Sequence, residues 1–145
     1  MTKEEKDLLL KDLCARLSYG VKISVQSWDE EEQEYVDKVD VLYSVNRDEY
    51  IKSTNEDYDF SIEDIKPYLL PLSSMTDEQR KELEELGLGY YVTCQDIDDG
   101  YMWDEKVFQI IPGTETDDWM NAHHFDYRCL IPKGLAINAT GLNIY

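Results

Sequence analysis

The chain has 145 residues, of which 42% are hydrophobic and 12% aromatic, and its formal net charge is −18. Its length and aromatic content exclude a disordered acidic tail and allow a core without disulfides or metal. The negative charge disfavours binding to nucleic-acid phosphates or anionic lipid, because both would be repelled before contact. We therefore expect a single domain over residues 1–145 whose partner is a basic or neutral protein, not nucleic acid or a membrane.

The negative charge is concentrated in the middle of the chain. Residues 1–22 and 126–145 each carry a net +1, whereas residues 23–125 hold seven basic and 27 acidic residues, a net −20. Such a segment is either a solubilising surface or a surface that recognises a cationic partner.

The N-terminal residues do not form a signal peptide, because charges interrupt their short apolar run. No stretch reaches the ~20 apolar residues of a membrane span, and we expect a cytoplasmic protein. Cys14, Cys94 and Cys129 are an odd number at long spacings, which fits neither a disulfide framework nor a zinc site. Reduced, mostly buried thiols are expected.

The first predicted element is an amphipathic helix. Thr2 and Glu5 form a capping box, and Gly20 is placed to end the helix. Asp7–Lys11 and Asp12–Arg16 have i,i+4 spacing and are expected as pairs on the solvated face. The apolar stripe is expected to comprise Leu9, Leu10, Leu13, Cys14 and Leu17.

The next segments predict a β-meander. Alternating apolar residues over 21–25 and 39–45 flank an acidic turn, which indicates a hairpin, and residues 50–53 predict a third strand. Pro67 and Pro71 prevent one long helix there and favour a helical turn followed by an irregular extended crossing.

The second half predicts two helices and three strands. Thr76 and Gln79 cap a helix over 77–86, and Thr116 opens a helix that runs to about Phe125. Strands are expected at 90–95 and 106–111, joined by an acidic loop, and at 135–138. The fold class is α+β, an antiparallel sheet of about five or six strands with about three helices packed mainly on one side.

One segment gathers residue types found in catalytic sites: His123, His124, Asp126 and Arg128. Adjacent histidines on a helix point about 100° apart, so they are poorly placed to bind one metal ion together. Either this segment is the centre of a small enzyme or metal-binding protein, or one histidine packs or caps the end of the third predicted helix and Asp126 pairs with Arg128. We assign no catalytic residue, metal ligand or cofactor, because no nucleophile, base and orienting group can be matched.

Rings and acids also cluster around the second predicted hairpin, a combination that is enriched at protein interfaces. This predicts a protein-interaction module, an accessory or inhibitory factor in which DNA mimicry is a special case. A homo-oligomeric structural part is a further alternative. The candidate interaction surface comprises Tyr90, Tyr91, Asp96, Asp98, Asp99, Tyr101, Trp103, Asp104 and Glu105.

Three stretches together resemble a known family: MTKEEKDLLLKDLCARLSYGVKI, PYLLPLSSMTDEQ and NAHHFDYRCLIPKGLAI. The chain is similar, over about half its length, to small uncharacterised acidic proteins of Bacteroides-type gut bacteria and their mobile elements. The resemblance implies a bacterial cytoplasmic protein with phage or plasmid ancestry, and it implies no catalytic or binding residue.

Overall fold

The computed structural model describes residues 1–98 and 101–145, with side chains described outside 94–104. The chain divides into two compact units, Met1–Leu72 with Met120–Tyr145, and Ser73–Trp119. The single domain expected over 1–145 stays a prediction, because one domain can contain two compact units. None of the helices in the described residues is both long and apolar enough to cross a membrane.

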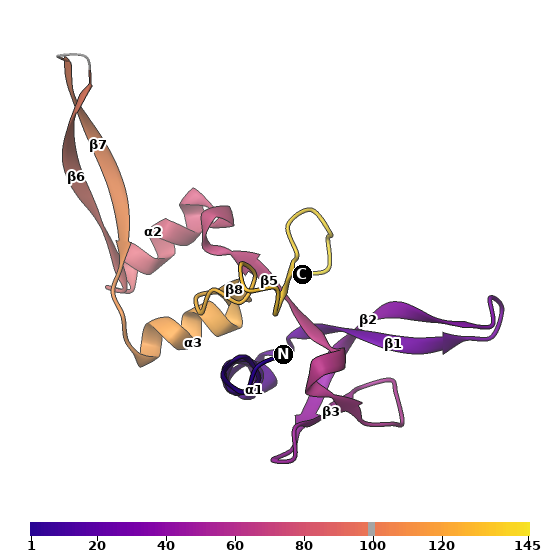
Figure 1. Cartoon of the computed structure of the whole chain (residues 1–145). Coiled ribbons are helices and arrows are strands. Elements are labelled where there is room, and N and C mark those ends of the chain that lie inside the picture. The colour runs from indigo at the N-terminus through magenta and orange to yellow at the C-terminus, as the bar shows by residue number, and fades with distance from the viewer. Residues whose placement is uncertain (99–100) are drawn as a thin grey trace. The chain divides into compact units, whose positions relative to one another are not determined.

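The first unit contains a seven-stranded mixed sheet (Figure 1). Its strand order is β4-β3-β2-β1-β5-β8, and β9 also pairs with β5. Strands β1 to β5 pair antiparallel, whereas β8 and β9 run parallel to β5. The strands are β1 (Lys22–Asp29), β2 (Glu34–Val45), β3 (Tyr50–Ser53), β4 (Phe60–Ser61), β5 (Lys66–Pro71), β8 (Phe125–Asp126) and β9 (Ile137–Asn138).

The α+β class is confirmed, but the prediction of a purely antiparallel sheet is wrong. The parallel pairs both involve β5, a segment that was predicted to be an irregular extended crossing because it contains two prolines. Pro67 and Pro71 stand near the two ends of the strand, where a missing backbone N–H is tolerated, so β5 can pair with β1, β8 and β9. The helical turn expected before it is confirmed as η2 (Ile62–Asp64).

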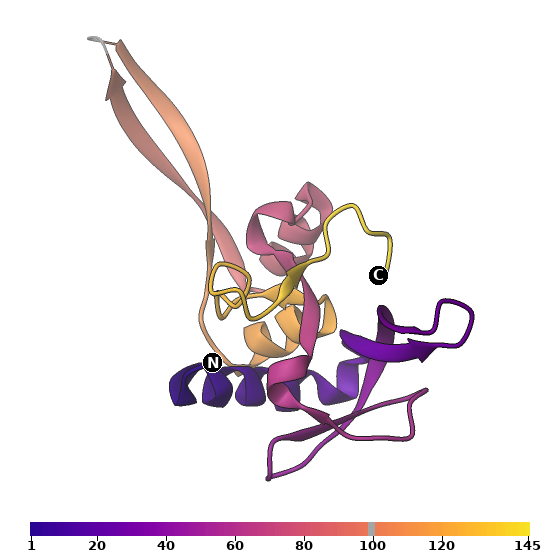
Figure 2. The same ribbon diagram turned by 45° about the vertical axis from the view of Figure 1, so that its right-hand side comes forward.

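Helix α1 (Lys3–Arg16) covers one face of this sheet, and it lies beside η2 (Figure 2). Its buried Leu9 and Leu13 share a core with Ile23, Leu42 and Ile51 of the strands. Buried and more exposed side chains alternate along β1, as they do when only one face of a sheet is packed. The sheet therefore has a packed inner face and an outer face.

Several expected elements of the first unit are confirmed. The hydroxyl of Thr2 accepts a hydrogen bond from the Glu5 backbone N–H at 3.1 Å, and the Glu5 carboxylate accepts one from Thr2 N–H. A 3₁₀ turn, η1 (Leu17–Tyr19), follows α1, and Gly20 then adopts φ 69°, the left-handed conformation that glycine allows at a helix end. The hairpin and the strand at 50–53 also form as predicted.

The second unit contains α2 (Asp77–Glu85) and an antiparallel pair, β6 (Gly89–Asp98) and β7 (Tyr101–Ile110), after η3 (Leu72–Ser74). The capping box of α2 is confirmed, with Thr76 and Gln79 bonded reciprocally. The prediction of an acidic loop between these strands is wrong for most of its length. Asp96 pairs with Trp103, and Asp98 pairs with Tyr101, as part of the β6–β7 strand pair.

Helix α3 (Thr114–Ala122) differs from its prediction at both ends. Thr116 does not open the helix: it lies in the first turn, and its hydroxyl donates to the Ile111 carbonyl at 2.6 Å. The helix ends before Phe125, because that residue pairs with Leu70 as part of β8.

Candidate functional site

A buried ion pair lies on the inner face of α1. The Nε of Arg16 donates to Oδ2 of Asp12 at 2.8 Å, and both side chains are fully buried. The expectation of a solvated Asp12–Arg16 pair is therefore wrong. These two residues alternate with Leu9 and Leu13 at i, i+3, i+4 and i+7, so the stripe that faces the core is half polar.

This pair binds the segment that follows α3. The Nη1 of Arg128 donates to Oδ1 of Asp12 at 2.8 Å, and Nη2 of Arg16 donates to the Phe125 carbonyl at 2.6 Å. Both guanidinium groups also contact the ring of Tyr127, with their central carbons 5.3 Å (Arg16) and 4.5 Å (Arg128) from its centroid. One carboxylate thus serves two arginines and fixes α1 to the chain around Phe125.

Asp126 stabilises a turn. Its two carboxylate oxygens accept the backbone N–H groups of Leu130 at 2.8 Å and Ile131 at 2.9 Å. The expected Asp126–Arg128 pair is wrong, because the arginine binds Asp12 and the aspartate binds backbone. Sequence spacing indicated that both groups need partners but not that the partner of Arg128 lies 116 residues away.

His124 packs against Tyr145, which confirms the expectation that one histidine packs at the end of the third helix. The two rings are stacked, 11° from parallel with centroids 3.8 Å apart. The Tyr145 hydroxyl donates to the Tyr68 carbonyl at 2.7 Å and accepts the Lys22 backbone N–H at 2.8 Å. The Lys22 ammonium also donates to the Ile144 carbonyl, so residues 144–145 are held on the first unit at several points.

The environment of His124 favours its neutral form. Burial is the main cause that lowers its pKa from 6.5 to about 4, and the positive charges of Arg16, His123 and Lys22 act in the same direction. Burial likewise raises the pKa of Tyr145 to about 12. The neutral imidazole stacks on Tyr145, so His124 contributes to the packing of the C-terminal residues.

Three of the four residues of the alternative site have separate partners. His124 contacts Tyr145, Asp126 binds backbone N–H groups and Arg128 binds Asp12. Among the side chains that the structure describes, those of residues 1–93 and 105–145, no three of His, Cys, Asp or Glu lie close enough to hold a metal ion. Cys14 and Cys129 are free and exposed, so the expectation of buried thiols is wrong for both, while the side chain of Cys94 is outside the described part.

The candidate interaction surface lies on β6 and β7. Tyr90 is 49% and Tyr91 45% exposed, on opposite faces of β6, and Tyr91 packs edge-on against Phe108 with centroids 5.0 Å apart. Glu105 is exposed. Asp99 lies outside the described residues, and only the strand backbone is described for Asp96, Asp98, Tyr101, Trp103 and Asp104.

A second surface, which the sequence analysis missed, is the outer face of the sheet in the first unit. Its large side chains are between 46% and 67% exposed. The buried positions of β2 are Asp40 and Leu42, so Val39 and Tyr43 lie on the opposite face of the strand. We define the outer face by Trp28, Tyr35, Val39, Tyr43 and Tyr50.

A comparison of the chain with protein-family models, curated proteins and solved structures found no match. The resemblance to acidic proteins of Bacteroides-type bacteria stays a prediction.

Replacing Asp12 by Asn should lower the free energy of unfolding by about 3–5 kcal/mol, because two arginines lose their shared carboxylate and Arg16 stays buried. Urea denaturation measures the loss. Asp7→Asn is the matched control, since Asp7 is exposed on the same helix, and it should change stability by less than about 0.5 kcal/mol. Equal effects of the two variants would show that the buried pair is not important for stability.

Lowering the pH should destabilise the protein through His124. Its folded pKa of about 4 lies below the unfolded value of 6.5, so the unfolded chain binds the proton first and stability falls as pH drops through this window. We expect a loss of about 1–2 kcal/mol between pH 7.5 and 5, reduced from the full shift because the ring is partly solvated. Thermal or urea unfolding across this range measures it.

His124→Asn should remove this pH dependence, and asparagine tolerates the left-handed backbone at this position, φ 63°. His123→Asn is the control and should keep the decline. An unchanged decline in the His124 variant would assign it to other groups.

Proposed function

We propose that this protein is a non-enzymatic interaction module that binds a basic surface of a partner protein through the outer face of its sheet. The net negative charge of the chain supports this proposal, and the outer-face side chains form the contact. The acidic surface then contributes recognition as well as solubility. We also propose that the protein acts in the cytoplasm.

The observation that carries the proposal is the exposure of five large side chains on one sheet face. Around Ile23, Val25 and Leu42 the opposite face of these strands shares a core with α1, so core packing does not account for the outer rings. Trp28 and Tyr35 face each other across β1 and β2, with centroids 5.2 Å apart and rings nearly perpendicular. Aromatic side chains that stay this exposed are typical of surfaces that contact another protein.

Charge determines the class of partner. Residues 28–37 hold six acidic and no basic residues, and they form the end of the hairpin that carries Trp28 and Tyr35. Cationic side chains gain from both parts of such a surface, because carboxylates attract them and aromatic faces bind them. A nucleic acid or an anionic membrane would be repelled. The favoured occupant is therefore a protein surface rich in arginine or lysine.

The double variant Tyr35→Ser/Tyr43→Ser tests the proposal, because it removes two outer-face rings and leaves the net charge at −18. Tagged wild-type protein, incubated at low salt with extract of its native host, should retain a partner of net positive charge. The partner should be released as ionic strength approaches 1 M, where the screening length is about 3 Å. The double variant should retain it at least roughly tenfold less well, since exposed rings are frequent binding hot spots.

Tyr90→Ser is the control, because Tyr90 is also an exposed tyrosine but lies on β6. It should retain the partner if the outer face is the contact. Loss of the partner with Tyr90→Ser alone would instead favour the β6–β7 surface. Capture of acidic proteins only, or equal capture by the wild type and the double variant, would contradict the proposal.

A further inference from the structure

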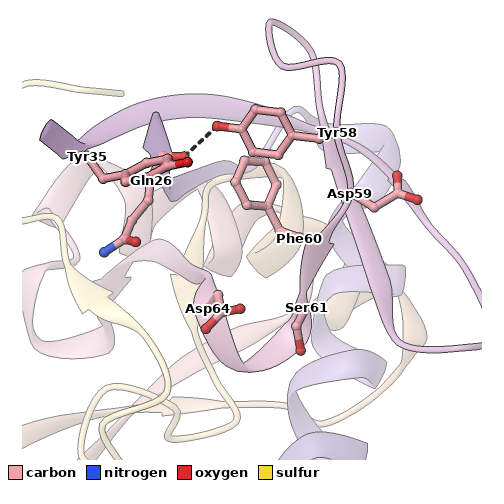
Figure 3. A pocket seen from close by; sticks show the side chains of 7 residues that line it. All are labelled: Gln26, Tyr35, Tyr58, Asp59, Phe60, Ser61 and Asp64. Atoms are coloured by element: carbon pink, nitrogen blue, oxygen red, sulfur yellow. Dashed lines mark hydrogen bonds between the residues drawn. The ribbon is translucent and has the colours of Figure 1, made fainter. Parts of the chain in front are cut away.

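A hollow of about 260 Å³ opens beside the outer face, at the edge of β1 (Figure 3). It is smaller than most pockets for small molecules, which have roughly 300–1,000 Å³, and its size suits a single side chain. It combines three aromatic rings with two carboxylates. The residues that line it are Gln26, Tyr35, Tyr58, Asp59, Phe60, Ser61 and Asp64.

The aromatic wall of the hollow is held in place before any ligand binds. The Tyr58 hydroxyl donates to the Gln26 backbone carbonyl at 2.8 Å, the bond drawn in Figure 3. The Tyr58 ring packs on Phe60, with centroids 4.8 Å apart, and Phe60 is itself part of the buried core. Tyr35 is supported by Trp28 across the hairpin. A ligand would therefore meet fixed ring faces at little cost in ordering.

Carboxylates complete the lining. In Figure 3 Asp64 lies at one end of the hollow, and Gln26 and Phe60 lie on opposite sides of it. Asp59 lies beyond Phe60 and pairs loosely with Lys52, at 4.0 Å.

A second hollow of about 280 Å³ shares Asp64 with the first. Asp37 and Glu63 also line it, with Lys66 as its only cation among the lining residues. Glu63 pairs with Lys6 at 2.9 Å. The other two carboxylates of this lining, Asp37 and Asp64, have no ion pair with the side chains that the structure describes. The negative charge thus continues along the edge of β1.

We propose that the first hollow binds the guanidinium group of an arginine side chain from the partner protein, with Tyr58 and Phe60 as its ring wall and Asp64 as its counter-ion. A planar guanidinium can stack on a ring while its N–H groups donate to a carboxylate, whereas an ammonium group is a compact point charge that cannot stack. The second hollow then accepts a neighbouring cationic side chain of the same segment. This inference rests on the proposed function and names the chemistry of its partner.

The test is an NMR titration of the isotope-labelled intact protein with the peptide acetyl-Gly-Arg-Gly-Arg-Gly-amide. The amide signals of Gln26, Tyr58–Ser61 and Asp64 should shift in a saturable way. The same peptide with citrulline, a neutral isostere of arginine, should bind at least roughly fivefold more weakly, because it keeps the shape and loses the charge.

Asp64→Asn should weaken binding of the arginine peptide by roughly two- to fivefold, as expected for one exposed ion pair. Asp48→Asn is the matched control, since Asp48 is exposed in the turn between β2 and β3 and lines neither hollow. It should weaken binding by less than roughly 1.5-fold, through long-range charge alone.

Equal binding of the arginine and citrulline peptides, equal effects of the two variants, or signal shifts confined to other residues would overturn the arginine site. If these results occurred while the Tyr35→Ser/Tyr43→Ser variant still failed to retain the basic partner, the arginine site would be wrong and the interaction module would stand.

Discussion

The first unit depends on the buried contact between Asp12 and its two arginines. Removing two or more charges from water costs several kcal/mol per ion, and only close pairing with further hydrogen bonds offsets that cost. Here the carboxylate bonds to Arg16 and Arg128, Arg16 also bonds the Phe125 carbonyl, and both guanidinium groups lie against Tyr127. Such a network tolerates few alternative arrangements, so it specifies how α1 docks against the chain that forms β8.

Basic residues of the two terminal segments make contacts within the fold. Arg16, Lys22 and Arg128 come from the two terminal segments of net positive charge, and all three make contacts within the fold. The acids of the central segment are then largely without cations to neutralise them. The aromatic outer face and the hollow beside β1 lie in this uncompensated region, which is why we place recognition of a basic partner there and not at His123–Arg128.

Local features of the fold were predictable, and pairings between distant segments were not. The capping boxes at Thr2 and Thr76 and the strand at 50–53 depend on neighbouring residues, and they form as expected. The inner position of Asp12 and Arg16 was missed because i,i+4 spacing gives a pair but not the face on which it lies. The stripe formed with Leu9 and Leu13 carried that information. Strand β5 was missed because proline destabilises a strand only at positions where a backbone N–H must donate to a neighbouring strand. Which positions these are depends on strand partners far along the chain.

The most direct test of this account is amide hydrogen exchange of the intact protein, alone and bound to the basic partner that it retains. We predict slower exchange in the bound state over residues 22–45 and 50–64, which contain the outer face and the hollow, with little change over 123–131. Protection confined to 123–131, or no protection in the first unit, would contradict recognition of a basic partner by the outer face.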